Sequence, residues 1–192
     1  LILLKFSKYA NFINTYFKNQ FSFDDKKFYY THCFNVGDVT IAVLGLNSAL
    51  LCMNDADQGR LAMSEYQVRS ALEATKEADL SIAIMHHPFG WFNDYDAANC
   101  EPLLMNACDF ILHGHLHRTG ILNLSTPDAQ AMIIAAGACY MSSNFLNRYN
   151  IVTVDPDTNE GVVYLRLYSD SQGGFVDSDI RIFQRGIRGL AG

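Results

Sequence analysis

The clearest pattern of apolar and polar positions is a pair of short apolar runs that each end in histidines. One lies within residues 82–88 (IAIMHHP) and the other within residues 110–118 (FILHGHLHR). Apolar runs of this length bounded by turn residues predict buried strands. Between them the pattern predicts a loop over 89–96 and a short helix near 97–106. A strand, a helix and a strand in this order predict a parallel unit with a right-handed crossover.

These two strands also predict where a site would lie. In an open α/β sheet, ligands bind beyond the carboxyl ends of the strands. Five of the six histidines of the chain follow the carboxyl ends of the two predicted strands. We therefore expect two turns that are far apart in the sequence to face one site, with the rest of the chain as its scaffold.

The remaining segments show the same mixture of helical and strand patterns. Residues 1–20 predict an amphipathic helix, and residues 28–34 and 39–46 predict a β-hairpin. A second helix is expected from Ser64, as N-cap with Gln67 at the capping-box position, to about Ala78. Further strands are expected at 121–124, 131–136, 150–154, 162–168 and 180–183. Parallel strands early and antiparallel strands late predict a mixed α/β layered fold.

Composition narrows the class of protein. With 192 residues, of which 49% are hydrophobic and 18% charged, the chain is expected to form one globular domain. The net charge of −6 does not favour binding to nucleic acid through its phosphates. Five cysteines without a C-x-x-C pair indicate reduced thiols in a cytoplasmic protein. The longest apolar run, 131–141, is too short to cross a bilayer, so no membrane association is expected.

The histidines differ in how strongly they indicate chemistry. A lone histidine at a strand, such as His32, is most often structural. His113, His115 and His117 place three imidazoles within five residues, which is an unusual choice for a protein core. Clustered imidazoles suit Zn, Fe, Mn, Ni or Cu. The alternatives are a solvated turn and an adventitious metal patch.

The two histidine motifs resemble those of a known family. His86-His87-Pro88, followed by Gly114-His115-Leu116-His117, resembles the last two motifs of the calcineurin-like metallophosphoesterases. The hairpin 28–48, the segment 59–72 and the small-residue turn 136–138 resemble further parts of the same family. The resemblance spans about residues 28–140.

This resemblance implies a fold and a set of metal ligands. The family is a four-layer αββα sandwich that binds two divalent metals, commonly Mn, Fe or Zn. By motif, His86 and His115 would bind one metal and His117 the other, whereas His87 would not be a ligand. Strict strand alternation would instead place His113 on the same face as His115 and His117. We follow the motif, because Gly114 is expected to end the strand and redirect the residues after it.

Three earlier motifs of the family are absent: D-x-H, G-D-x-x-D and G-N-H-D/E. Residues 37–38 (Gly-Asp) lack the second aspartate and fall in the predicted hairpin. We therefore expect residues 1–192 to be the C-terminal part of a single calcineurin-like phosphoesterase domain that is incomplete at its N-terminal side. The isolated chain would bind one metal or none and would need the missing N-terminal half. Asp94 and Asp96 are candidates to reach the same edge.

The function implied by the resemblance is metal-dependent hydrolysis of a phosphate mono- or diester by a water that two metals activate. The substrate would be a phosphate ester. Trp91 and Phe92 of the aromatic loop, residues 89–95, would line its binding site. The alternative for these aromatic residues is packing against the sheet. Two other functions stay open: a non-catalytic binding or regulatory module that retains the phosphoesterase fold, and a protein that binds a single metal through His86, His115 and His117.

Overall fold

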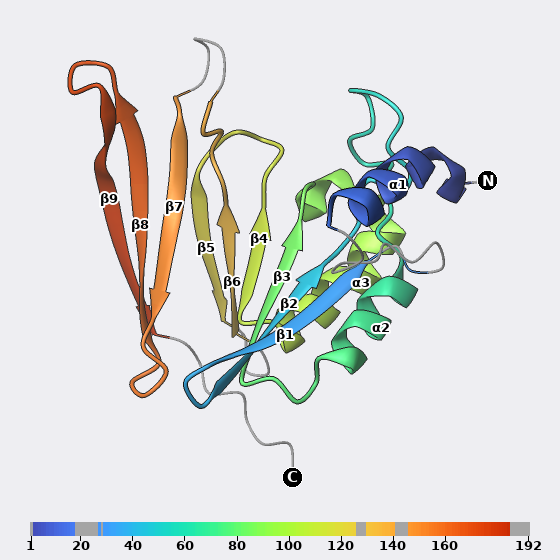
Figure 1. Cartoon of the computed structure of the whole chain (residues 1–192), viewed down its shortest axis with the longest axis horizontal. Helices are drawn as coiled ribbons and strands as arrows, with labels where there is room; N and C mark the ends of the chain where they lie inside the picture. The colour runs from blue at the N-terminus through green and yellow to red at the C-terminus, as the bar shows by residue number, and fades with distance from the viewer. Residues whose placement is uncertain (1, 18–26, 28, 126–129, 141–145, 185–192) are drawn as a thin grey trace.

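A computed structural model of the chain describes residues 2–17, 27, 29–125, 130–140 and 146–184 (Figure 1). The helical elements are η1 (Ile2–Phe6), α1 (Ser7–Tyr16), α2 (Glu65–Ala74), η2 (Phe89–Trp91) and α3 (Asp94–Ala107). The strands are β1 (Tyr30–Val36), β2 (Val39–Gly45), β3 (Leu80–Met85), β4 (Phe110–His113), β5 (Gly120–Ser125), β6 (Gln130–Ala135), β7 (Arg148–Val154), β8 (Glu160–Ser169) and β9 (Gly174–Gln184).

The larger sheet has six strands in the order β1-β2-β3-β4-β6-β5. β2, β3, β4 and β6 are parallel, and the two edge strands β1 and β5 run antiparallel to their neighbours. The predicted strand–helix–strand unit is confirmed, because β3 and β4 pair in parallel and α3 connects them. The predicted hairpin is also confirmed, with a tight turn in which Gly37 adopts a φ of +60° that favours glycine.

Helices α2 and α3 cover one face of this sheet (Figure 1). Leu44 and Ile111 from the strands are fully buried in one core with Val68 of α2 and Leu104 of α3. Fully burying such a side chain stabilises the fold by about 1.5–3 kcal/mol. This helical layer therefore holds the parallel strands and their carboxyl ends in place.

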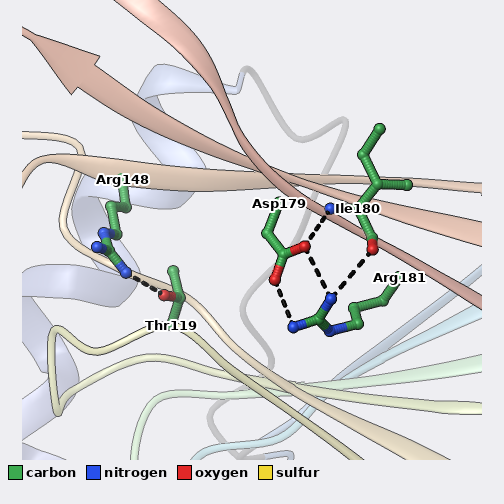
Figure 2. Close-up of polar contacts among 5 residues, drawn as sticks. All are labelled: Thr119, Arg148, Asp179, Ile180 and Arg181. Atoms are coloured by element: carbon green, nitrogen blue, oxygen red, sulfur yellow. Dashed lines mark hydrogen bonds and ion pairs between the residues drawn. The ribbon is translucent and has the colours of Figure 1, made fainter.

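The second sheet, β7-β8-β9, is antiparallel and packs against the opposite face of the first. Phe183 of β9 meets Phe110 of β4 edge to face, with ring centroids 5.6 Å apart. Near the carboxyl ends of the parallel strands, the Arg148 guanidinium on β7 donates a hydrogen bond of 3.0 Å to Thr119 Oγ1 (Figure 2). Gly137 permits this approach, because a Cβ there would lie 2.6 Å from Arg148 Cβ.

The described residues thus form three layers, one of helices and two of sheets, and the predicted α/β layered fold is confirmed. The N-terminal element η1 lies near the carboxyl ends of the parallel strands, where its Lys5 ammonium donates to the carbonyls of Ala49 (2.9 Å) and Cys52 (3.1 Å). Among the helices that the structure describes, none is both long and apolar enough to cross a lipid bilayer.

The predicted start of α2 after Ser64 is confirmed, but its predicted capping box is wrong, and the helix ends at Ala74 rather than near Ala78. The predicted start of α3 is also wrong. Ser64 precedes α2, but its side chain makes no cap hydrogen bond and its φ is +76°. The Gln67 side chain instead accepts from the backbone N–H of Asn47 and donates to the Asn47 carbonyl. Helix α3 begins at Asp94, earlier than expected, because the Asn93 side chain caps it by accepting from the N–H of Asp96 (3.0 Å).

Candidate metal centre

The two histidine motifs meet at the carboxyl edge of the larger sheet, as the strand order predicts. Met85 at the end of β3 pairs in register with His113 at the end of β4. The pairing continues past the strands, where the N–H of Gly114 donates to the carbonyl of His86 (3.1 Å). This fixes the His86-His87 turn directly beside the turn that carries His115.

Three imidazoles form a cluster there: His86, His87 and His115 each offer a ring nitrogen, and these atoms lie within 4.8 Å of one another. His86 Nε2 and His115 Nδ1 are 3.2 Å apart. Two nitrogen ligands of a tetrahedral zinc, at about 2.0–2.1 Å from the metal, lie roughly 3.3–3.4 Å apart. The spacing of this pair therefore fits two ligands of one metal ion.

Ser48 organises the first histidine turn from the end of β2. Its buried Oγ accepts the backbone N–H groups of His86 (3.1 Å) and His87 (3.0 Å). The same oxygen lies 3.0 Å from His87 Nδ1. Because Oγ already accepts two hydrogens, the hydrogen-bond geometry assigns its own hydrogen to a bond donated to Nδ1.

This hydrogen bond bears on whether His87 binds a metal. A neutral His87 that accepts at Nδ1 carries its hydrogen on Nε2, so neither nitrogen has a free lone pair. His87 is also buried, with 4% of its surface exposed. The arrangement favours a structural role for His87, in agreement with the role that the family motif implies.

The turn after β4 breaks strand alternation. His115 and His117 have φ values of +69° and +54°, in the left-handed region that residues other than glycine rarely adopt. Such backbone conformations cluster at functional sites. His113 is half-buried, and its Nδ1 lies 3.2 Å from the carbonyl oxygen of Gly114. The expectation that Gly114 ends the strand and redirects the residues after it is confirmed.

His117 lies outside the tight cluster but close enough to influence it. Burial lowers the pKa values of both His86 and His115; the neighbouring His117 lowers both further, and His86 also lowers that of His115. Burial, together with the imidazoles of His86 and His115, lowers the pKa of His87 to about 4. The cluster is therefore neutral at neutral pH, as metal ligation requires. The assignment of His86, His115 and His117 as ligands stays a prediction.

The aromatic loop contributes one wall of the site. The Trp91 ring meets His115 edge to face, with ring centroids 3.9 Å apart, and stacks on His87 at 5.7 Å. The loop is held in place because the carbonyl of Trp91 accepts from the N–H groups of Gly59 (3.0 Å) and Leu61 (3.2 Å). Phe92 has only 3% of its surface exposed and belongs to the core, which is the packing role weighed for it.

Of the two loop aspartates considered as further ligands, Asp94 is exposed in the first turn of α3, and its role as a ligand stays a prediction. Asp96 is buried, and its two oxygens accept from the N–H groups of Met63 (2.6 Å) and Ser64 (2.9 Å), so its carboxylate is occupied by backbone. Burial lowers the pKa values of His115 and His87, and the charges of Asp55 and Asp57, respectively, partly oppose this lowering.

Asp57 has a structural role as well. Its Oδ2 accepts from the N–H groups of Met53 (2.6 Å) and Asn54 (2.9 Å), and these bonds lower its pKa. Sequence reasoning missed Ser48, Asp55 and Asp57. One sequence feature could have identified Ser48 as a residue of the site. It lies in the turn directly after β2, and β2 pairs with β3, the strand that leads to His86.

His32 lies apart from the cluster, on the edge strand β1. It is exposed and stacks on Phe34 with ring centroids 5.7 Å apart. It is not a member of the three-histidine group. The structure therefore brings together the two histidine motifs and leaves His32 out, as the sequence predicted.

The structure of the chain is similar to several solved structures. The chain is similar to GAP50, described as the anchor in the inner membrane complex of Plasmodium, with a TM-score of 0.52 and 16% identity over 86% of this chain and 56% of that one. The calcineurin-like phosphoesterase YfkN from Bacillus subtilis scores 0.34 at 14% identity, over 89% of this chain and 52% of that one. Vps29 of Chaetomium thermophilum scores 0.33 at 9% identity, over 81% and 61%.

The chain is thus similar in fold to GAP50, and its two histidine motifs meet in one cluster. Of these three structures, only GAP50 has a TM-score above 0.5. At 16% sequence identity, this similarity supports a shared fold and not a shared function. The chain spans little more than half the length of GAP50. No model of a protein family matches the sequence, and no curated protein matches it.

Proposed function

We propose that this chain forms the histidine-bearing part of a metal-dependent phosphoesterase, a hydrolase that acts on a phosphate mono- or diester. The observation that carries the proposal is the His86 Nε2–His115 Nδ1 pair, 3.2 Å apart at the carboxyl edge of a parallel sheet. This edge is where α/β sheets bind their ligands. The pair has the spacing, and the cluster has the neutral imidazoles, that metal ligation needs.

In this proposal His86 and His115 hold one divalent metal and His117 holds a second, with Mn, Fe or Zn as the metals. When bound, such a metal pair polarises a phosphoryl group and activates a water. Ser48 keeps His86 oriented through its backbone, and Trp91 contacts the organic part of the phosphate ester beside His115. Phe92, which was expected to line the substrate site with Trp91, is buried in the core, so the proposal assigns the substrate contact to Trp91.

The proposal extends to the architecture. Residues 1–192 would be the C-terminal part of a single four-layer αββα domain, whose remaining helices, strands and carboxylate ligands come from a segment outside this sequence. Partial coverage of GAP50 supports this reading. None of the five cysteines, which all lie among the described residues, forms a disulfide, and this supports the proposal of a reducing, cytoplasmic environment.

A second function is favoured by one observation. Two dications at close range need anionic ligands between them, because their repulsion is strong in a protein interior. The carboxylates of Asp57 and of the candidate Asp96 are both engaged by backbone N–H groups. If no carboxylate joins the cluster, the chain would be a non-catalytic binding or regulatory module that retains the phosphoesterase fold.

The test measures metal content by elemental analysis and hydrolysis of a chromogenic phosphodiester, in residues 1–192 and in the full-length protein. We expect the isolated chain to hold one metal or none with little turnover, and the full-length protein to hold two metals and turn over. In the full-length protein, His117→Ala should lower turnover at least about a hundredfold, whereas His32→Ala should leave it unchanged.

Two outcomes would contradict the proposal. A full-length protein that holds metals but hydrolyses neither mono- nor diesters would favour the non-catalytic module. Equal losses from His117→Ala and His87→Ala would show that His87 is also a ligand and that the motif assigned the wrong histidine.

A further inference from the structure

The second histidine turn, residues 114–119, has both of its ends tied to one residue. The turn connects β4 to β5. His113, directly before it, pairs in parallel with Ala135 of β6, and Gly120, directly after it, pairs with Ala135 from the other side. The position of Ala135 therefore sets both ends of the turn.

The backbone of this turn adopts conformations that need support from its surroundings. His115 and His117 lie in the left-handed region, with φ values of +69° and +54°. Residues with a side chain keep such conformations only where neighbouring contacts hold them. At its first residue the turn is held by the other histidine motif, because the N–H of Gly114 donates to the carbonyl of His86 (3.1 Å). The support at its far end comes from the smaller sheet.

Strand β7 reaches that far end with two polar side chains. Side chains alternate along a strand, so those of Arg148, Asn150, Val152 and Val154 share one face of β7. Val152 and Val154 pack against the apolar core between the two sheets. Arg148 and Asn150 continue the same row toward the carboxyl ends of the parallel strands, and we call these two residues the β7 clamp.

The β7 clamp contacts both the last residue of the turn and the residue that fixes its ends. The Arg148 guanidinium donates to Thr119 Oγ1 (3.0 Å), as Figure 2 shows. The Asn150 side-chain amide donates to the carbonyl of Ala135 (3.1 Å). The backbone of Arg148 is held in turn, since its N–H donates to the carbonyl of Ala138 (2.8 Å). The clamp thus joins the smaller sheet to the base of the histidine turn.

The surroundings of the β7 clamp favour its polar contacts over apolar packing. A Cβ at Gly137 would lie 2.6 Å from Arg148 Cβ and 3.3 Å from Thr119 Cγ2, so a side chain there would force the two residues apart. Arg148 Nε and Asn150 Oδ1 are buried and have no hydrogen-bond partner among the described residues. Such unpaired polar atoms are uncommon in folded proteins, and each calls for an explanation. Apolar residues at both positions would avoid them, so the polar pair is best explained by what it holds.

We propose that Arg148 is a positioning residue for the metal site. Its bond to Thr119 holds the second histidine turn in the backbone conformation that the two metal-binding imidazoles need. None of the ion pairs found among the described residues includes Arg148, so its guanidinium is committed to this contact. Arg148 acts through the turn and touches neither metal nor substrate. The link to metal binding rests on the proposed function, whereas the effect on the turn itself does not.

The experiment uses the full-length protein and removes the same hydrogen bond from either side. Arg148→Met and Thr119→Val each remove one partner, whereas Thr119→Ser keeps the hydroxyl and should behave as the unchanged protein. Arg181→Met is the matched control, because the Arg181 side chain bonds within its own strand, to Asp179 and to the carbonyl of Ile180 (Figure 2).

Hydrogen exchange in EDTA reports on the turn without any metal. The amides of Gly114 and Leu116 are both hydrogen-bonded, and Val163 lies in the core between the sheets. In Arg148→Met and in Thr119→Val we expect the two turn amides to be accelerated at least about tenfold more than the amide of Val163, because the turn then opens locally. In Arg181→Met and Thr119→Ser the turn amides should keep their rates.

Metal binding and turnover test the consequence for the site. Arg148→Met and Thr119→Val should each weaken Zn²⁺ binding by about tenfold, which is the effect expected when a group that orients a ligand is lost. Both should lower kcat more than they change KM for a chromogenic phosphodiester. The double variant should lose no more than either single variant, because the two substitutions remove one bond.

Three outcomes would overturn the proposal: equal acceleration of the turn and the core amides, losses of Zn²⁺ affinity that add in the double variant, and a Thr119→Ser variant that behaves like Thr119→Val. The first would show that Arg148 supports the whole fold and not the turn. A protein that binds no metal but shows the faster exchange of the turn would contradict the proposed function alone.

Discussion

At the scale of single residues, Ser48 shows how a side chain without catalytic chemistry can shape a site. It is 2% exposed and uses its one hydroxyl in three hydrogen bonds, two accepted from backbone and one to an imidazole. These bonds set the direction of the chain at His86 and occupy Nδ1 of His87. Ser48 is therefore a positioning residue, which acts through the histidines.

We predict that Ser48→Ala destabilises the protein by about 2–4 kcal/mol, because it leaves two buried backbone N–H groups and a buried imidazole nitrogen without a partner. Urea denaturation measures this loss. Ser171→Ala, at an exposed turn, is the control and should change stability by less than about 0.5 kcal/mol. Affinity for Zn²⁺ should also fall in Ser48→Ala. Unchanged zinc affinity in a folded variant would mean that Ser48 does not position His86.

At the scale of elements, a side chain in the first turn of α3 bonds to the backbone at the start of α2. The Asp96 carboxylate in α3 accepts from the backbone N–H groups of Met63 and Ser64, which precede α2. This contact takes the place of the capping box that the local sequence predicts. A carboxylate near a helix N-terminus also interacts favourably with the helix dipole.

We predict that Asp96→Asn destabilises the protein by about 1–3 kcal/mol, because an amide nitrogen would face one of the two backbone donors. Asp94→Asn is the matched control, since Asp94 lies two residues earlier on the same helix and is exposed. Thermal and urea unfolding measure the difference. Metal content should be the same in both variants, and a loss of metal in Asp94→Asn would restore Asp94 as a candidate ligand.

At the scale of the whole molecule, the two sheets share an apolar core in which Val163 and Phe183 of the smaller sheet meet Phe110, Met132 and Ile134 of the larger one. The smaller sheet thus covers the half of the larger sheet that lies beside the second histidine strand. This packing joins the C-terminal strands to the elements that carry the site.

We predict that Phe183→Ala destabilises the whole molecule by about 3–5 kcal/mol, because it opens a cavity between the sheets. Ile182→Ala, at the neighbouring exposed position, should cost less than about 0.5 kcal/mol. Circular dichroism and tryptophan fluorescence should report the same urea transition. Trp91 lies beside the histidines, so two separate transitions would mean that the sheets unfold independently.

The sequence by itself determined the strands, their parallel arrangement around α3, and the meeting of the two histidine motifs at one edge. The reason is that apolar periodicity and turn residues are local signals, and the edge at which parallel strands end follows from topology. It also predicted that Gly114 would end its strand.

Only the tertiary structure decided which polar groups meet across long stretches of chain. Ser48 reaches His87 across 39 residues, and Asp96 reaches Met63 across 33. Neither contact has a local pattern, because each depends on how strands and helices pack. The same holds for the left-handed turns at His115 and His117. These features depend on burial and on hydrogen bonds between residues that are far apart in the sequence. Neighbouring residues in the chain give no pattern that predicts them.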